Sequence, residues 1–338
     1  MNGQLAEIFP AQTVHLFSQT FLSGIYQWGI AVIGVIQTIK NPILTALVKF
    51  ITTLGTEALY GPLILFIFWW VDEKQGLRLG IILLVSAWIN VVFKDLLKQP
   101  RPFNLEPSIG LTVEHGYGAP SGHAQNSMSF WIPMAVWLEK LWPRRRTLMW
   151  AGIIFFMLLI AFTRLYLGVH FPTDIFVGWI LSGILLFIWF IPGKRIEKLF
   201  TSLDVRLQNI CIAVIALLMN GICPHDRTLP ALFLGFCLGY TLMKQRFPFS
   251  ARAEINGKKP GVKIMVFRCL TGLIGMAVIY LALKLILPGE GSFFSSISFW
   301  GQASPYYELG RFIRYGLLGF WASAGAPQVF QRMGLAAK

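Results

Sequence analysis

The sequence predicts an all-α membrane protein, a polytopic bundle of hydrophobic helices. Of the 338 residues, 55% are hydrophobic and only 13% are charged, whereas soluble domains carry about 25% charged residues. The apolar residues come in long uncharged runs, such as Leu79–Phe93, Leu148–Phe162 and Ile175–Ile191. With its flanks, each run approaches the roughly 20 residues that a helix needs to cross a bilayer.

The expected spans follow these runs along the chain. Phe17–Ile39 is apolar enough to cross, whereas Ala46–Leu59 is interrupted by polar and charged residues and is expected to lie on the membrane surface as an amphipathic helix. No Lys or Arg precedes Lys40, so no secretory signal peptide is expected. The remaining expected spans, which bring the total to nine or ten, are 58–71, 76–97, 123–142, 147–167, 173–191, 207–222, 230–243, 264–287 and 309–324.

Basic residues predict the orientation of the bundle, because cytoplasmic loops of membrane proteins are enriched in Lys and Arg. The basic clusters occupy alternate loops: Lys74 with Arg78, 144–146, 194–198 and 244–263. These loops are expected in the cytoplasm, which puts the loops at 98–122, 164–172 and 224–229 on the opposite side. Arg311 and Arg314 disagree, since they would begin the last span from that outer side.

Two other readings of the composition are not favoured. The formal net charge of +14 belongs to short loops between apolar segments, so the positive-inside bias explains it better than nucleic-acid binding does. The cysteines form no C-x-x-C pair, so neither a zinc site nor a redox motif is expected. They are expected to pack as small apolar residues: Cys211, Cys223, Cys237 and Cys269.

Three clusters of polar residues are expected at one face of the membrane. They are Lys94 with Arg101-Pro102, the run Pro120-Ser121-Gly122-His123, and Arg164 with His170 and Asp174. Ionisable residues at membrane depth are functional candidates, because burying them in lipid is costly. Singly, each cluster has a structural explanation: lysines that snorkel from a helix end, Ser121 as a helix cap, and an Arg164–Asp174 ion pair.

Together, the clusters supply the parts of a phosphoryl-transfer site. Lys94, Arg101 and Arg164 provide three cations, and arginine offers paired donors that suit phosphate oxygens. Ser121 and the Gly122 N–H lie at the expected start of a helix, where anions bind readily. Such a site works by positioning and positive charge.

The histidines supply the proton and electron-pair chemistry. His170 and Asp174 can form a pair in which the carboxylate orients the imidazole and keeps it nucleophilic. His123 is then free to act as general acid on the leaving oxygen. His123, His170 and Asp174 could be drawn as metal ligands, but the three nearby cations argue against a metal ion there, so none is expected. No Cys is followed by Arg at five-residue spacing, which excludes the cysteine phosphatases, and Gly257-Lys258-Lys259 lacks the upstream Gly of a P-loop.

At these residues the sequence resembles the type 2 phosphatidic acid phosphatase superfamily, which includes lipid phosphatases, glucose-6-phosphatase and the vanadium haloperoxidases. The signatures K-x6-RP, PSGH and SR-x5-H-x3-D read here as KDLLKQPRP (94–102), PSGH (120–123) and TRLYLGVHFPTD (163–174). Thr163 stands where Ser is usual and keeps the hydroxyl. The resemblance covers roughly residues 24–192, a six-span core, and says little about residues 200–338.

The resemblance implies a role for each matching residue. His170 would be the nucleophile, Asp174 its orienting partner and His123 the acid. The phosphate would be bound by five residues: Lys94, Arg101, Ser121, Gly122 and Arg164. No cofactor or metal would be needed.

The expected organisation has three parts. They are an N-terminal span with an interfacial helix (1–58), a catalytic core (59–199), and about four additional spans (200–338). The expected function is hydrolysis of a lipid phosphate or diphosphate, of the phosphatidate, phosphatidylglycerol phosphate or undecaprenyl diphosphate type, through a phosphohistidine. The expected location is the bacterial inner membrane, with the site facing the periplasmic or outer side.

Other functions remain open at this stage. The same site could serve a soluble phosphate ester, as in glucose-6-phosphatase, or pass the phosphoryl group to an alcohol as a phosphotransferase. A transporter or a binding protein without activity is the alternative outside enzymes, although every catalytic position is filled. The loop 103–119 and the later spans are expected to shape substrate choice. His225 and Asp226 are expected to be solvated rather than catalytic, and the oligomeric state is not predicted.

Overall fold

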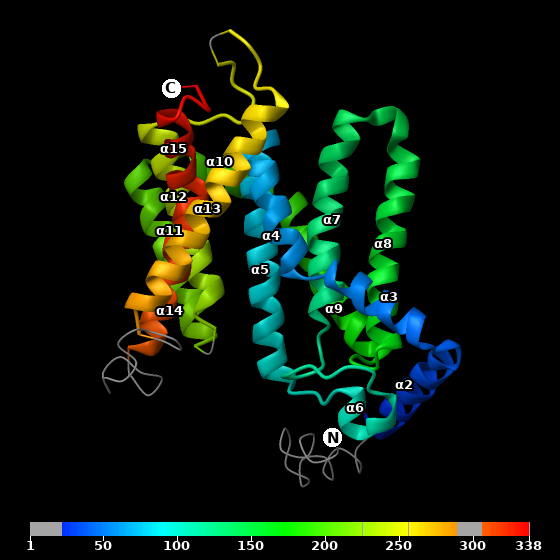
Figure 1. Cartoon of the computed structure of the whole chain (residues 1–338). Helices are drawn as coiled ribbons and strands as arrows, with labels where there is room; N and C mark the ends of the chain where they lie inside the picture. The colour runs from blue at the N-terminus through cyan, green and yellow to red at the C-terminus, as the bar shows by residue number, and fades with distance from the viewer. Residues whose placement is uncertain (1–21, 225, 256, 289–305, 338) are drawn as a thin grey trace. The chain divides into compact units, whose positions relative to one another are not determined.

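The computed structural model describes residues 22–224, 226–255, 257–288 and 306–337. Within these ranges the regular structure is helical (Figure 1), apart from one isolated bridge between Ile255 and Lys258. The chain divides into two compact units, Met1–Tyr60 with Ile89–Ile188, and Gly61–Trp88 with Trp189–Lys338. The predicted all-α fold class is confirmed.

The first unit holds the residues of all three predicted clusters. Its elements are α2 (Leu22–Ile36), α3 (Pro42–Thr53), the start of α4 (Glu57–Phe66), the end of α5 (Glu73–Leu97), α6 (Pro102–Leu105), α7 (Gly122–Leu141), α8 (Arg146–Tyr166) and nearly all of α9 (Pro172–Phe190).

The α7–α8 pair separates the basic end of this unit from the end that carries the three clusters. The two helices run antiparallel and are joined by the short helix Pro143–Arg145 (Figure 1). Pro143 ends α7, because the residue before a proline disfavours helical backbone. The exposed residues Arg144–Arg146 therefore lie at one end of the pair, and the beginning of α7 with the end of α8 lies at the other.

Buried polar side chains join α5, α7 and α9. The Asn90 amide donates to Gln125 Oε1 at 2.9 Å, and the Ser129 and Ser182 hydroxyls are 2.8 Å apart. Polar pairs of this kind hold helices together where lipid supplies no hydrophobic driving force between them. One face of α7 is polar for this reason.

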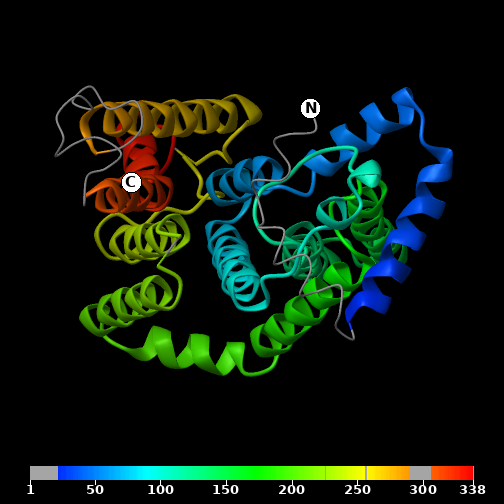
Figure 2. The same ribbon diagram turned by 90° about the horizontal axis from the view of Figure 1, so that it is seen from below.

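The helices α2 and α3 are bent by 119° at the break between them, which is visible in Figure 2. Asn41 caps α3 by accepting the Leu44 N–H at 2.9 Å, and Pro42 occupies the first turn. The buried Gln37 amide, just before the break, donates to the carbonyls of Ile109 and Tyr166, each at 2.8 Å. The bent pair is thereby tied to the long loop after α5 and to the end of α8.

That loop packs closely against the α8–α9 connection. The Leu111 N–H donates to the Leu167 carbonyl at 3.0 Å, and Phe103 packs in one buried cluster with Tyr166 and Val169. Gly168 has φ +69°, and a Cβ there would lie 2.0 Å from the Ile109 carbonyl oxygen. Only glycine fits this position, because its backbone is left-handed and the neighbouring backbone approaches closely.

The second unit is built from the later helices. They are α10 (Gly193–Ser202), α11 (Val205–Ile222), α12 (Thr228–Arg246), α13 (Val262–Ile286), α14 (Tyr307–Phe320) and α15 (Ala326–Arg332), with the π-helical turns Ile67–Val71 and Trp321–Gly325. Arg268 on α13 is fully buried and donates to the carbonyls of Trp69, Ala251 and Leu335. It connects α13 to three segments that are distant in sequence.

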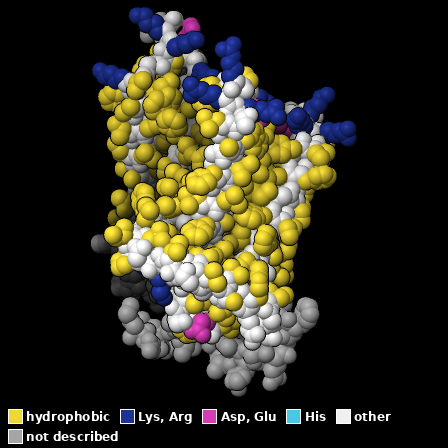
Figure 3. All heavy atoms as spheres, turned by 90° about the vertical axis from the view of Figure 1, so that its right-hand side faces the viewer, with side chains coloured by type: hydrophobic (Ala, Val, Ile, Leu, Met, Phe, Trp, Pro, Cys, Tyr) yellow, Lys and Arg dark blue, Asp and Glu magenta, His cyan; other side chains and the backbone are white. Residues whose placement is uncertain are grey.

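Among the described residues, five helical segments are long and apolar enough to cross a membrane, and the bent pair would make a sixth. This is fewer than the nine or ten spans expected. The helix α7 is too polar to qualify because its buried face carries Gln125, Asn126 and Ser127, and α14 has only 14 residues. The face in Figure 3 is largely hydrophobic, with most of its Lys and Arg at one end. The qualifying segments are Glu73–Leu105, Pro143–Tyr166, Pro172–Phe190, Val205–Ile222 and Val262–Ile286.

The predicted segments agree with the helices to within a few residues, with two differences. The predicted surface helix Ala46–Leu59 is replaced by α3, which begins at Pro42 and ends at Thr53. The helix α10 was not predicted, because it is short and amphipathic. The beginning of the first expected span and His225 lie outside the described residues. Asp226 lies just before α12 and accepts the Thr228 N–H at 2.7 Å.

We predict that Gly168→Ala lowers the free energy of unfolding by about 2 kcal/mol or more, because the new methyl group meets the Ile109 carbonyl in a left-handed backbone. Thermal unfolding of the detergent-purified protein measures the loss. Gly334→Ala is the matched control, since Gly334 has φ +70° but open space around it, and it should cost about 1 kcal/mol. Equal losses in the two variants would contradict the steric argument.

Candidate active site

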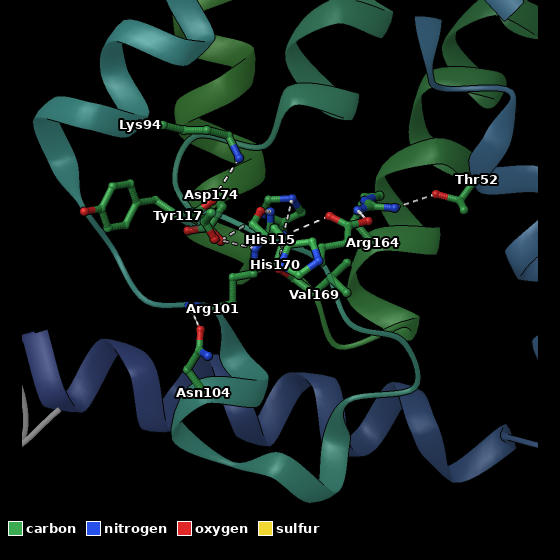
Figure 4. Close-up of polar contacts among 12 residues, drawn as sticks. Thr52, Lys94, Arg101, Asn104, His115, Tyr117, Arg164, Val169, His170 and Asp174 are labelled. Atoms are coloured by element: carbon green, nitrogen blue, oxygen red, sulfur yellow. Dashed lines mark hydrogen bonds and ion pairs between the residues drawn. The ribbon is translucent and has the colours of Figure 1, made fainter. Parts of the chain in front are cut away.

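The three predicted clusters meet in the first unit, where the end of α5, the beginning of α7 and the α8–α9 connection come together (Figure 4). The centre of the group is the imidazole of His170, which is 1% exposed. His170 Nδ1 lies 3.2 Å from Asp174 Oδ2, and the same carboxylate oxygen accepts the Phe171 N–H at 2.9 Å. Because Pro172 begins α9, Asp174 lies in its first turn and reaches back to His170.

Arg101 lies at the other ring nitrogen of His170, the one that faces away from Asp174. Its Nη1 is 3.4 Å from His170 Nε2 and 3.1 Å from the Val169 carbonyl. Arginine can only donate hydrogen bonds, so Nε2 accepts and Nδ1 carries the proton that faces Asp174. The guanidinium also donates to the carbonyls of His115 (3.1 Å) and Gly116 (3.0 Å).

Lys94, near the end of α5, is held by the same loop. Its ammonium group donates to the Tyr117 carbonyl at 2.8 Å. The backbone carbonyls of residues 115–117 therefore supply acceptors to two of the three predicted cations. Residues 115–117 form no helix or strand, and their backbone carbonyls bind this part of the loop to the site.

Arg164, near the end of α8, is 1% exposed. Its Nη1 donates to Thr52 Oγ1 on α3 at 2.7 Å, and its Nη2 donates to Glu114 Oε1. The Nε–H is buried and has no hydrogen-bond partner in the structure. The structural alternative in which Arg164 pairs with Asp174 is wrong, because Glu114 binds Arg164 and His170 binds Asp174.

Ser121 precedes the first turn of α7 but does not cap it. Its hydroxyl accepts no backbone N–H of the helix and, although fully buried, has no partner in the structure. The alternative in which Ser121 serves as a helix cap is therefore wrong. The Ser121 N–H donates to the Asp174 carbonyl at 2.9 Å, which fixes the start of α7 against the start of α9.

His123 is the second residue of α7 and lies beside the connection between α3 and α4. A Cβ on Gly55 would be 3.0 Å from His123 Cδ2, so glycine lets that connection approach the imidazole. His123 interacts electrostatically with Arg164, Glu114 and Lys94. It therefore belongs to the same group of charges as the other predicted residues.

Two members of the group were missed by the sequence analysis, Glu114 and Thr52. Glu114 Oε2 accepts from Arg101 Nη1 at 3.0 Å, while Oε1 accepts from Arg164. Glu114 lies in the loop 103–119, but no periodicity marks one polar loop residue as more important than its neighbours. Thr52 was counted as an interruption of an apolar segment, whereas its hydroxyl is a partner of Arg164.

Burial and the neighbouring positive charges favour a neutral His170 imidazole. Burial, followed by the positive charges of Arg101 and Arg164, holds the pKa of His170 well below its ordinary value of 6.5. Burial alone would raise the pKa of the Glu114 carboxyl, but the charge and hydrogen bond of Arg164 outweigh it, and the pKa lies below 4.5. At neutral pH, His170 is uncharged and Glu114 is ionised. Among the described residues, no three His, Cys, Asp or Glu side chains are grouped as metal ligands would be.

Comparisons with known proteins show which family the chain belongs to. Residues 75–196 match the PAP2 superfamily. The chain is 32% identical to phosphatidylglycerophosphatase B of Bacillus subtilis (strain 168), over 44% of this chain and 74% of that protein. It is 31% identical to the undecaprenyl-diphosphatase of Sulfolobus acidocaldarius, over 47% of this chain and 78% of that protein. The chain belongs to the PAP2 superfamily.

The match extends beyond the catalytic region. Residues 228–338 match the transmembrane extension of PAP2 superfamily phosphatases. Over 88% of its length the chain is 25% identical to sphingosine-1-phosphate phosphatase 2 of Mus musculus, covering 90% of that protein. No solved structure matches the chain. As a PAP2 protein, the chain is an integral membrane hydrolase of phosphoric monoesters or diphosphates.

We predict that Thr52→Val lowers kcat/KM for phosphate release by roughly 10-fold or more. The charged donor Arg164 loses its hydrogen bond to the Thr52 hydroxyl, and a bond of this kind contributes about 1.5–3 kcal/mol. The kinetics of the purified variant measure the loss. Thr53→Val is the matched control, since the exposed Thr53 hydroxyl bonds only the Phe50 carbonyl of its own helix. Equal activity of the two variants would show that Thr52 does not support Arg164.

Proposed function

We propose that the protein removes phosphate from a lipid phosphate or diphosphate through a phosphohistidine on His170. The observation that carries this proposal is the buried His170, which has Nδ1 against Asp174 and Nε2 beside Arg101. A neutral imidazole whose Nδ1–H is held by a carboxylate has its lone pair on Nε2. This lone pair becomes available for attack when a phosphate oxygen takes over the Arg101 N–H that faces it. That lone pair lies at the edge of a strongly cationic site.

In the proposed reaction, Nε2 of His170 attacks phosphorus and the bond from phosphorus to the leaving oxygen breaks. The negative phosphate offsets the positive charges of Arg164 and Lys94 around His123, so that His123 takes up a proton in the complex and gives it to that oxygen. The released product is an alcohol or a lipid phosphate. Water then attacks the phosphohistidine, His123 takes a proton from it, and inorganic phosphate leaves. Asp174 stabilises the positive charge that His170 gains while it carries the phosphoryl group.

The phosphate oxygens would be bound by five residues. Lys94, Arg101 and Arg164 supply positive charge, and Ser121 with the Gly122 N–H supplies donors at the start of α7. The support for this set is that the Ser121 hydroxyl and the Arg164 Nε–H are buried without partners. Buried donors in proteins are nearly always satisfied, so these two favour a ligand that brings acceptors.

A lipid substrate is favoured by the membrane setting and by the relatives. The site lies at the ends of apolar helices, where the headgroup of a lipid would be within reach. Relatives are named for sphingosine-1-phosphate, phosphatidylglycerol phosphate and undecaprenyl diphosphate. A soluble ester is the second candidate, because the chain is also 28% identical, over 36% of its length, to the glucose-6-phosphatase catalytic subunit 1 of Canis lupus familiaris.

We further propose the cytoplasmic membrane of a bacterium as the location, with the site on its outer side. The support is that the basic turn Arg144–Arg146 lies at the opposite end of α7 and α8 from the site. Basic loops remain in the cytoplasm, so the end that carries His170 would face outward.

For the wild-type protein we predict phosphate release from at least one lipid phosphate in the presence of EDTA, and a loss of at least about 10³-fold in His170→Ala. The assay uses detergent-purified protein with a panel of lipid phosphates, lipid diphosphates and glucose 6-phosphate. His115→Ala is the control, because the His115 side chain is exposed and only its backbone carbonyl binds Arg101.

An acid-labile, alkali-stable phosphoprotein should form when labelled substrate is quenched during turnover, and it should be absent in His170→Ala. If glucose 6-phosphate is the only compound of the panel that is hydrolysed, the substrate is a soluble ester rather than a lipid. Full activity of His170→Ala, or inactivity of folded wild-type protein on the whole panel, would contradict the proposal.

The orientation can be measured by cysteine labelling in whole cells. In a variant without the native cysteines, we predict that a membrane-impermeant maleimide labels Ser108→Cys, in the loop after α5, and does not label Ser202→Cys at the end of α10. Both serines are exposed. The reverse pattern would place the site on the cytoplasmic side.

A further inference from the structure

We infer that Glu114 is a positioning residue, which holds Arg101 and Arg164 in the arrangement that receives the substrate phosphate. This inference rests on the proposed function, since it gives a role to a residue beside the same phosphate site. It concerns a loop residue that lies outside all three sequence motifs.

The first observation is that Glu114 bridges the two arginines. One carboxylate oxygen accepts from Arg101 Nη1 at 3.0 Å, and the other accepts from Arg164 Nη2. The two arginine side chains are 3% and 1% exposed, whereas that of Glu114 is 30% exposed. In the part of the chain that the structure describes, both recorded ion pairs of these arginines end on Glu114.

The second observation is the accumulation of like charge. Lys94, Arg101 and Arg164 influence one another electrostatically, and buried like charges repel strongly because the protein interior screens them weakly. Until phosphate binds, an anion between the two guanidinium groups offsets that repulsion. Asp174 cannot do this alone, because its carboxylate is bonded to His170 and the Phe171 N–H.

The third observation is which donors remain free. Thr52 accepts from Nη1 of Arg164 and Glu114 accepts from Nη2, so the planar guanidinium is held at both ends. Its Nε–H stays without a partner, as does the buried Ser121 hydroxyl. Glu114 thus fixes the plane of Arg164 and leaves donors for phosphate oxygens.

The fourth observation is that Glu114 belongs to a segment that orients the other cations through its backbone. The carbonyls of residues 115 and 116 bind Arg101, and that of residue 117 binds Lys94. Glu114 adds a side chain and a negative charge to the contacts that this segment makes with the cations. Its role can therefore be tested by one substitution that leaves the backbone contacts in place.

The test compares Glu114→Gln with Glu106→Gln. Glu106 is in the same loop, but its carboxylate binds only Ser108. In Glu114→Gln we expect a fall in kcat/KM of roughly 10- to 100-fold and a similar weakening of inhibition by orthovanadate and inorganic phosphate. Glu114→Asp keeps the charge and should recover part of the loss. Glu106→Gln should equal the wild type.

Binding is also measured without turnover, as the rise in unfolding temperature that orthovanadate causes in each variant. A variant that has simply lost its fold would unfold early even without ligand. A folded Glu114→Gln protein that keeps the full vanadate shift and full kcat/KM would overturn the inference.

Tighter vanadate binding in Glu114→Gln would also overturn it, by showing that the carboxylate competes with phosphate for the arginines. If the wild type binds vanadate but hydrolyses nothing, the proposed function fails while the role of Glu114 is still decided by the binding arm. If the wild type binds no vanadate, both fail.

Discussion

Burial of positive charge beside the membrane is the constraint on which the site depends. Arg101 and Arg164 are almost fully buried, and a buried charge without a partner is strongly destabilising. Glu114 and Thr52, together with the carbonyls of the loop after α5, supply the partners. The path of that loop follows from this requirement, because its backbone oxygens have to reach two cations that are attached to different helices.

Hydrogen bonds also hold the ends of the helices in place beside the site. The start of α7 is tied to the start of α9 by the Ser121 N–H, and Gln37 ties the bent pair α2–α3 to the loop. Polar contacts deeper in the unit, between Ser129 and Ser182, join α7 to α9. These bonds hold α7 against α9 and the bent pair α2–α3 against the loop. They also explain why α7 is more polar than a helix that faces lipid alone.

Sequence patterns predicted the helices because the apolar runs are long, and their ends agree with the structure to within a few residues. They were less reliable for the number of spans. The polar residues of α7, such as Gln125, lie in a buried interhelical face, so an apolar average over the helix understates how well it packs. The amphipathic α10 was missed because its apolar residues are too few to form a run.

The sequence by itself determined the fold class and predicted the motif residues of the candidate site, although not Glu114 or Thr52, because the signatures place Lys, Arg, His and Asp at spacings that phosphoryl transfer requires. Only the tertiary structure decided the partners. Arg164 meets Thr52 across 112 residues and Glu114 across 50, and ion pairing depends on distance in space rather than on spacing in the chain. For the same reason, the free hydroxyl of Ser121 and the bridging role of Glu114 become visible only when the helices are packed together.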